Sequence, residues 1–216
     1  MMRTSQLPTT VLRRGLLAGA AVTATLVLSA CGGSDHSSSG TGMNHGATTA
    51  ASPAASAVGT FNDADVTFAQ AMIPHHQQAV QMADMADGRA ADAEVKQLAG
   101  KIQAAQQPEI DTMTGWLTAW GKPAPEPHMS MGSGTGHGSM PGMMTDADMA
   151  KLMDAKGAAF DKQFLTMMIA HHEGAIEMAQ TEVAQGSNPE AKTLAQKIIT
   201  DQQAEITTMK TILERL

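Results

Sequence analysis

Residues 72–83, Met-Ile-Pro-His-His-Gln-Gln-Ala-Val-Gln-Met-Ala, recur with few changes as residues 168–179, Met-Ile-Ala-His-His-Glu-Gly-Ala-Ile-Glu-Met-Ala. This histidine-methionine cassette is part of a longer repeat, because residues 65–117 and 161–213 match at 22 of 53 positions without a gap. A repeated unit of this length is most simply a pair of helices that stacks on its own copy. The duplication therefore sets the expected fold.

The apolar residues of both copies recur at helical spacing, and no stretch shows the alternation of a β-strand. Capping and stop signals predict four helices, at about 62–88, 92–121, 146–185 and 188–216. Pro74 predicts a kink in the first helix rather than a break, since the second copy has Ala170 there. Four helices in two antiparallel hairpins predict an all-α four-helix bundle, whose interior commonly holds metal sites.

The first thirty residues predict an export signal rather than part of the fold. Three arginines precede an apolar run over 16–28, and Leu28-Ser29-Ala30-Cys31 has the form of a small-residue cleavage site. A cysteine at this place resembles the lipobox of bacterial lipoproteins. Cys31 is therefore expected to carry a lipid anchor on the outer face of the cytoplasmic membrane. The alternative is an ordinary signal peptide in which Cys31 has no role.

Composition divides the rest of the chain. Residues 31–59 are rich in Gly, Ser, Thr and Ala without apolar periodicity, which predicts a flexible tether. The duplicated bundle is expected over 60–216, with repeat one at 60–120, a Met- and His-rich linker at 121–145 and repeat two at 146–216. Because the linker has no core pattern, we expect it to contribute little to folding.

Charge and cysteine content exclude several kinds of partner. Without the leader, eleven basic residues remain against 21 acidic ones, which argues against nucleic acid and against binding anionic lipids through basic patches. Cys31 is the only cysteine, so neither a disulfide nor a thiolate metal site can form within the chain. Histidine and methionine must then supply any soft-metal ligands.

Each cassette places thioethers beside imidazoles on one helix. Residues three, four or seven apart share a helix face, so Met72 lies near His75 and His76, and Met82 follows two turns after His75. The second copy repeats these candidate ligands as Met168, His171, His172 and Met178. Thioether with imidazole favours a soft metal, Cu(I) above all and Ag(I) as well. We expect separate or pseudo-symmetric sites in the two repeats, the alternative being one central site that facing helices share. One histidine of each pair is expected to face the interior and the other a neighbouring helix or solvent.

Two further groups of residues are candidates for supporting roles. Polar residues on the core stripes of the second and fourth helices could hold imidazole N–H groups: Gln106, Glu109, Gln202 and Glu205. The linker carries residues suited to weak metal capture: His128, Met129, Met131, His137, Met140, Met143 and Met144. The alternatives are an idle linker and methionines that simply fill the core, since residues 31–216 hold sixteen methionines and no tyrosine.

The first cassette continues from its histidines as His75-His76-Gln77-Gln78-Ala79-Val80-Gln81-Met82-Ala83, and the second as His171-His172-Glu173-Gly174-Ala175-Ile176-Glu177-Met178-Ala179. Both resemble the cassettes of the DUF305 family, which includes copper-binding CopM-like proteins. The resemblance covers about 61–216 and includes the pairs Asp65/Asp161 and Met72/Met168. It implies an exported, ferritin-like four-helix bundle, with copper binding and copper tolerance proposed for members and no established catalytic activity.

Three functions compete at this point. The first is a membrane-anchored copper-binding protein that sequesters Cu(I) or passes it to an unidentified protein partner. The second is a ferritin-like di-metal oxidoreductase, but such sites use Glu-x-x-His pairs and the chain has none. The third is a structural or partner-binding bundle. We expect the first, a binding protein and not an enzyme.

Overall fold

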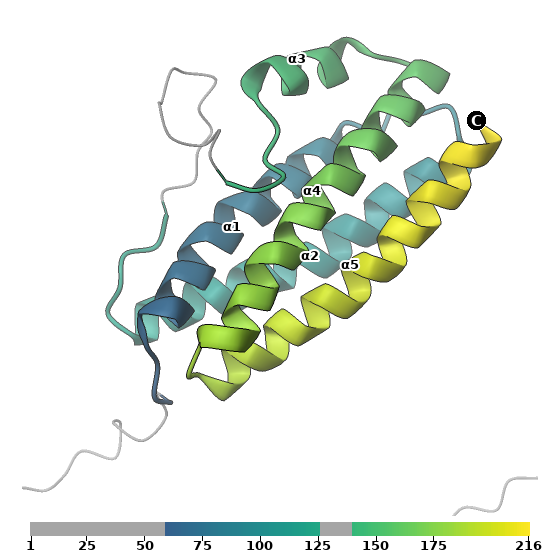
Figure 1. Ribbon diagram of the computed structural model, residues 1–216. Coiled ribbons are helices and arrows are strands. Elements are labelled where there is room, and N and C mark those ends of the chain that lie inside the picture. Colours follow the sequence, from purple (N-terminus) through teal and green to yellow (C-terminus); the bar gives the residue numbers. More distant parts are fainter. Residues whose placement is uncertain (1–58, 126–139) are drawn as a thin grey trace, which may run out of the picture. The chain divides into compact units, whose positions relative to one another are not determined.

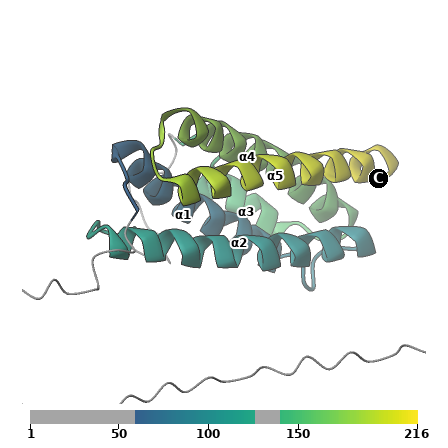
Figure 2. The ribbon, with the colours of Figure 1, turned by 90° about the horizontal axis from the view of Figure 1, so that it is seen from below.

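The computed structural model describes residues 59–125 and 140–216, and all regular structure in these residues is helical. Helices α1 (Asp63–Asp84) and α2 (Ala93–Ala119) form one antiparallel hairpin, and α4 (Ala158–Gln185) and α5 (Pro189–Arg215) form the other (Figure 1). α1 packs against α4 and α2 contacts α5, so the two hairpins stack as layers (Figure 2). The expected all-α four-helix bundle is confirmed.

The prediction of one continuous third helix was wrong, because the segment is interrupted. Thr145 caps a short helix α3 (Asp146–Asp154) as expected, but the chain leaves the helix at Ala155. The main helix α4 begins only after Gly157, whose φ of +63° is a left-handed conformation that favours glycine. The Gly157 N–H donates to the Arg89 carbonyl at 2.8 Å, which ties this break to the turn between α1 and α2.

The helix starts follow the capping signals in the sequence. The Asn62 side chain accepts hydrogen bonds from the backbone N–H groups of Ala64 and Asp65, and the Asp65 carboxylate accepts one from the Asn62 N–H. Such a reciprocal capping box satisfies donors that the first helical turn leaves free. α1 then continues through Pro74 without a break, as the second copy suggested.

The core consists of two apolar clusters that a polar layer separates. The Phe68 cluster uses the first half of α1 and the second half of α4, and the Phe164 cluster uses the opposite halves. Between the clusters, the four long helices α1, α2, α4 and α5 contribute buried polar side chains: His75 and His76, Gln106 and Glu109, His171 and His172, and Gln202. The repeat therefore places one polar layer across the middle of the bundle.

Two buried aspartates join the repeats at opposite ends of this core. Asp65 of α1 accepts hydrogen bonds from the backbone N–H groups of Ser187 and Asn188, 3.1 and 2.9 Å away, just before α5. Asp161 of α4, its equivalent in the second copy, accepts from the two N–H groups just before α2, at 3.1 and 2.9 Å. Each aspartate thus holds the turn of the other hairpin.

Glu182 lies beside Asp65 and makes this end of the bundle sensitive to pH. Glu182 is 1% exposed, and neither carboxyl oxygen has a hydrogen-bond partner among the described residues. Burial, and then the neighbouring Asp65 carboxylate, raise the pKa of Glu182 to about 8, against the smaller opposing effect of Lys192. Hydrogen bonds from the backbone of Asn62 and Asn188 keep Asp65 ionised despite its burial and hold its pKa below the usual value.

We expect Glu182→Gln to abolish one component of the pH dependence of stability. The unfolded pKa is near 4.5, so folding retains a proton on Glu182 from pH 4.5 to about 8. The group's contribution to the free energy of unfolding therefore falls as the pH rises through this window, by at most about 1.4 kcal/mol per pH unit. Urea unfolding should show Glu182→Gln gaining stability over the parent as the pH rises. Glu177→Gln, at an exposed position of the same helix, should show no such trend; a pH-independent difference for Glu182→Gln would contradict the assignment.

Several predictions fall outside the described residues: the export signal, the lipid anchor at Cys31 and residues 31–58 of the tether. Within the described ranges, no helix is both long enough and apolar enough to cross a membrane.

Candidate metal centre

His75 and His171, one from each repeat, face each other in the polar layer. Their ring centroids lie 3.7 Å apart with the ring planes at 39°, and both side chains are fully buried. They meet because α1 and α4 pack antiparallel, which brings the midpoints of the two cassettes together. This geometry brings one imidazole from each repeat together, so it favours the alternative of a central site that both repeats share.

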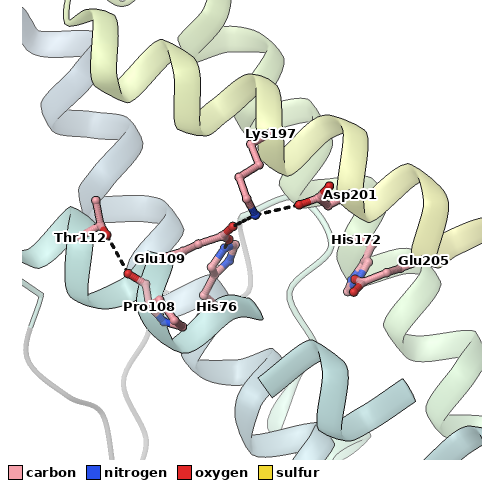
Figure 3. Close-up of polar contacts among 8 residues, drawn as sticks. All are labelled: His76, Pro108, Glu109, Thr112, His172, Lys197, Asp201 and Glu205. Carbon is pink, nitrogen blue, oxygen red and sulfur yellow. Dashed lines mark hydrogen bonds and ion pairs between the residues drawn. The ribbon is translucent and has the colours of Figure 1, made fainter. Parts of the chain in front are cut away.

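The second histidine of each cassette points to the partner helix of its own hairpin. The His76 Nε2–H donates to the Glu109 carboxylate at 2.8 Å, and the His172 Nε2–H donates to the Glu205 carboxylate at 2.6 Å (Figure 3). The second histidine of each pair was expected to face a neighbouring helix or solvent, and it faces the neighbouring helix. No histidine of the cassettes faces solvent. Glu109 and Glu205, two of the four candidates for a supporting role, thus accept hydrogen bonds from imidazole.

Lys197 of α5 adds a contact that the sequence did not indicate. Its ammonium donates to Glu109 at 3.0 Å and to Asp201 at 2.7 Å, so it links the second repeat to the first (Figure 3). Burial raises the pKa of Glu109, but the hydrogen bonds and charges of His76 and Lys197 outweigh this and lower it overall. Lys101 occupies the equivalent position of the first copy. A lysine repeated in both copies was therefore the sequence feature that could have indicated the Lys197 contact.

Burial keeps the central imidazoles neutral. Desolvation, and then the charge of His76, lower the pKa of His75 to about 3. Desolvation, followed by the charge of His75, holds the pKa of His171 well below its usual value. A neutral imidazole has one nitrogen with a free lone pair, which is the form that binds metals.

Hydrogen bonds select which nitrogen is free. The His75 Nε2–H donates to the Pro141 carbonyl at 3.0 Å, which leaves the lone pair on Nδ1. At His76 and His172 the Nε2–H likewise donates to a carboxylate, and Nδ1 has no hydrogen-bond partner among the described residues. His171 differs, because neither of its ring nitrogens has a partner among the described residues.

Unpartnered polar atoms accumulate in this layer. Among the described residues, eight buried side-chain atoms of the layer have no hydrogen-bond partner: His75 Nδ1, His76 Nδ1, Gln106 Nε2 and Oε1, His171 Nδ1 and Nε2, His172 Nδ1 and Gln202 Oε1. Each such atom costs about 1–3 kcal/mol when it stays unmatched. Gln106 and Gln202 are buried as expected, but no hydrogen bond joins them to an imidazole. The free lone pairs on the imidazole nitrogens and on the two amide oxygens therefore fit an occupant that accepts lone pairs, whereas Gln106 Nε2 and one His171 nitrogen are hydrogen-bond donors.

The cassette methionines lie on both sides of the layer. Met72 belongs to the Phe68 cluster, and Met82 and Met168 belong to the Phe164 cluster; all three are fully buried. Met178 is only half-buried and lines a surface pocket with Glu182. Three of the four thioethers are thus inside the bundle, and Met72 and Met168 each precede a central histidine by about one turn.

The linker contacts the bundle more than its composition suggested. Residues 140–144 lie against α1 and α4, and the Gln78 side chain exchanges two hydrogen bonds with the Met144 backbone, at 2.7 and 2.9 Å. The linker was expected to have no core pattern, but this part of it contacts the bundle. The contacts are made by backbone groups and by the Met144 side chain, which packs against the Phe164 cluster. Met140, Met143 and Met144 are half-buried. The other capture candidates, His128, Met129, Met131 and His137, lie outside the described residues.

The donor set suits a soft ion better than a hard one. Within residues 59–125 and 140–216, no three His, Cys, Asp or Glu side chains are grouped so that they could hold a metal. Two facing imidazoles with thioethers one turn away remain, and imidazole with thioether favours copper. The fold and this layer define a class of protein: a duplicated four-helix bundle with a buried histidine-methionine centre.

The chain belongs to the DUF305 family, a domain of unknown function, whose family model matches residues 65–213. It is similar to a DUF305 protein of Streptomyces coelicolor, named as presumed secreted, with 37% identity, a TM-score of 0.63, and coverage of 70% of this chain and 93% of that one. It is also similar to CopM in its Cu(II)-bound form, with 37% identity, a TM-score of 0.60, and coverage of 70% and 96%.

A curated relative matches a shorter stretch. Uncharacterized protein L153 of Acanthamoeba polyphaga mimivirus is 46% identical over 54 residues, which are 25% of this chain and 36% of that protein. The matched stretch thus spans about a third of the length of that relative.

Proposed function

We propose that this protein binds copper, with Cu(I) favoured, in a centre that both repeats share, and that it sequesters the ion or hands it on. The observation that carries the proposal is the apposition of His75 and His171, whose buried nitrogens lack partners. The nitrogens of these two residues, with the thioethers of Met72 and Met168, would hold the ion. CopM, which has been solved in Cu(II)-, Cu(I)- and Ag-bound forms, supports the choice of metal.

We propose binding rather than catalysis. A carboxylate-bridged di-metal oxidoreductase needs several carboxylates around one point in the bundle interior. Here Glu109 and Glu205 are engaged with His76 and His172 instead. The pairing of neutral imidazole with thioether favours holding a soft ion over redox chemistry with hard ligands.

We also propose that the protein is exported and anchored through Cys31. The leader pattern supports export, as does similarity to a relative named as presumed secreted. Cell fractionation tests the anchor: Cys31→Ser should move the protein from the membrane fraction to the soluble fraction.

The metal choice is tested by competition. The fragment beginning at residue 60 should bind Cu(I) far more tightly than Zn(II) in an anaerobic titration, because thioether sulfur is a poor ligand for Zn(II). Zn(II) that displaces Cu(I) at equal concentration would overturn the soft-metal proposal.

Methionine substitution separates a ligand from a core filler. Met72→Leu with Met168→Leu keeps apolar volume, so the free energy of unfolding should change by less than about 1.5 kcal/mol. Cu(I) affinity should nonetheless fall at least about tenfold, or by 1.4 kcal/mol, because leucine offers no sulfur. Met113→Leu with Met209→Leu is a matched control, since these methionines are also repeat-equivalent and fully buried but belong to α2 and α5, which carry none of the cassette histidines. Equal copper affinity in both variants would return Met72 and Met168 to the core-filler role.

A further inference from the structure

Residues 140–144, which we call the strap, cross the bundle ahead of α3 and lie over α1 and α4 (Figure 1). Gln78 fastens one end: its side-chain oxygen accepts from the Met144 N–H at 2.7 Å, and its side-chain N–H donates to the Met144 carbonyl at 2.9 Å. Nearer its start, the Pro141 carbonyl accepts from the His75 Nε2–H at 3.0 Å. The strap thus reaches a central histidine through its backbone.

Two glycines allow this close approach. A Cβ on Gly174 of α4 would lie 2.1 Å from the Pro141 carbonyl oxygen and 2.7 Å from the Gly142 nitrogen. A Cβ on Gly142, whose φ is +75°, would lie 2.6 Å from the Ala170 carbonyl oxygen and 3.0 Å from that of His171. The obstructing atoms are backbone atoms, which cannot move aside as the end of a side chain can. Backbone therefore packs directly on backbone at this point.

The residue that binds the strap and the glycine that makes room for it occupy the same position of the repeat. Gln78 and Gly174 are equivalent in the two copies, three residues after His75 and His171, within cassettes that are otherwise closely matched. One copy supplies a side chain that grips the strap, and the other supplies the space for it. The strap consequently makes the two histidines unlike: His75 has a carbonyl partner and His171 has none.

We propose that Gln78 and Gly174 are positioning residues that seat the strap over the central pair, so that the Pro141 carbonyl fixes His75 as the Nε2–H tautomer and presents Nδ1 as the ligand atom. The seated strap also covers the His75–His171 pair, which is fully buried beneath it. The effect on copper rests on the proposed function, whereas the effect on the tautomer does not. Hydrogen-bond partners of this kind commonly change metal affinity by about 10- to 100-fold.

The first experiment needs no metal. Long-range ¹H–¹⁵N NMR of the imidazoles should show His75 protonated at Nε2 in the parent chain. Gly174→Ala should displace the strap and give His75 a mixture of tautomers, and Gln78→Ala should do the same without adding an atom to the packed interface. Gly100→Ala and Gly115→Ala are matched controls on α2, where an added Cβ meets nothing within 4 Å. An unchanged His75 tautomer in Gln78→Ala and Gly174→Ala would overturn the proposal.

The second experiment uses Cu(I) with the same variants. Transfer of Cu(I) to a soluble chelator should be about tenfold or more faster from Gln78→Ala and Gly174→Ala than from the parent and the α2 controls. Rates equal to those of the controls would contradict the positioning role. If the parent chain bound no Cu(I) while the tautomer shifted as expected, the copper function would fail and the seating of the strap would stand.

Discussion

Replacing His75 and His171 together with alanine is expected to weaken the tightest Cu(I) binding by at least about 100-fold, or about 2.7 kcal/mol. Both imidazoles are buried, neutral and unpartnered at one nitrogen or more, so they are the strongest candidate donors in the layer. An anaerobic titration against a Cu(I) chelator measures the loss. Far-UV circular dichroism should show that the variant keeps its helices, since the apolar clusters on both sides are untouched.

The single variants decide how the site is divided. If His75 and His171 bind one ion together, His75→Ala and His171→Ala should each abolish the binding of that one tightly bound Cu(I) ion. If each repeat holds its own ion, each variant should lose one equivalent and keep another. The ring separation of 3.7 Å leads us to expect the shared result. Tight binding that survives the double substitution would move the site to His76, His172 or the linker.

The sequence predicted the local structure of this protein well, because local structure depends on spacing along one helix. The Asn62 cap and the two hairpins follow from periodicity and capping, whereas the burial of both histidines of each pair was only one of two expected outcomes. The sequence also offered Glu109 and Glu205, beside Gln106 and Gln202, as partners for the imidazoles, without saying which histidine each would contact. Each of these histidine–carboxylate contacts lies within one hairpin, where a short turn limits how the two helices can align.

The contacts between hairpins could not be predicted in the same way. Whether His75 meets His171 depends on how far α1 slides along α4, and no residue spacing within one helix reports that offset. The same holds for Lys197 on Glu109, which joins α5 to α2. The strap lay in a stretch without apolar periodicity, and only one sign of it existed: glycine replaces Gln78 at position 174 of a cassette that otherwise changes little.

Asp161→Ala should lower the free energy of unfolding by about 3 kcal/mol. The carboxylate is buried, and its loss leaves two backbone N–H groups at the start of α2 without their acceptor. Hydrogen bonds to a charged group contribute about 1.5–3 kcal/mol each, and stranded donors add their own desolvation cost. Urea unfolding gives the measurement. Asp161→Asn, which keeps one carbonyl oxygen, should lose clearly less.

Asp65 and Asp161 hold opposite ends of the bundle. Alanine substitutions at the two positions should therefore lower the free energy of unfolding by amounts that are close to additive. Sites without shared partners usually add within about 0.5 kcal/mol. Asp63→Ala is a matched control, because Asp63 is exposed in the first turn of α1 and holds no turn of the other hairpin; its effect should stay within about 1 kcal/mol. Asp65 and Asp161 both lie at ends of the bundle, away from the polar layer. The folded Asp161→Ala variant should therefore bind Cu(I) as the parent does. A loss of copper affinity without a loss of stability would instead make this repeated aspartate part of the metal centre.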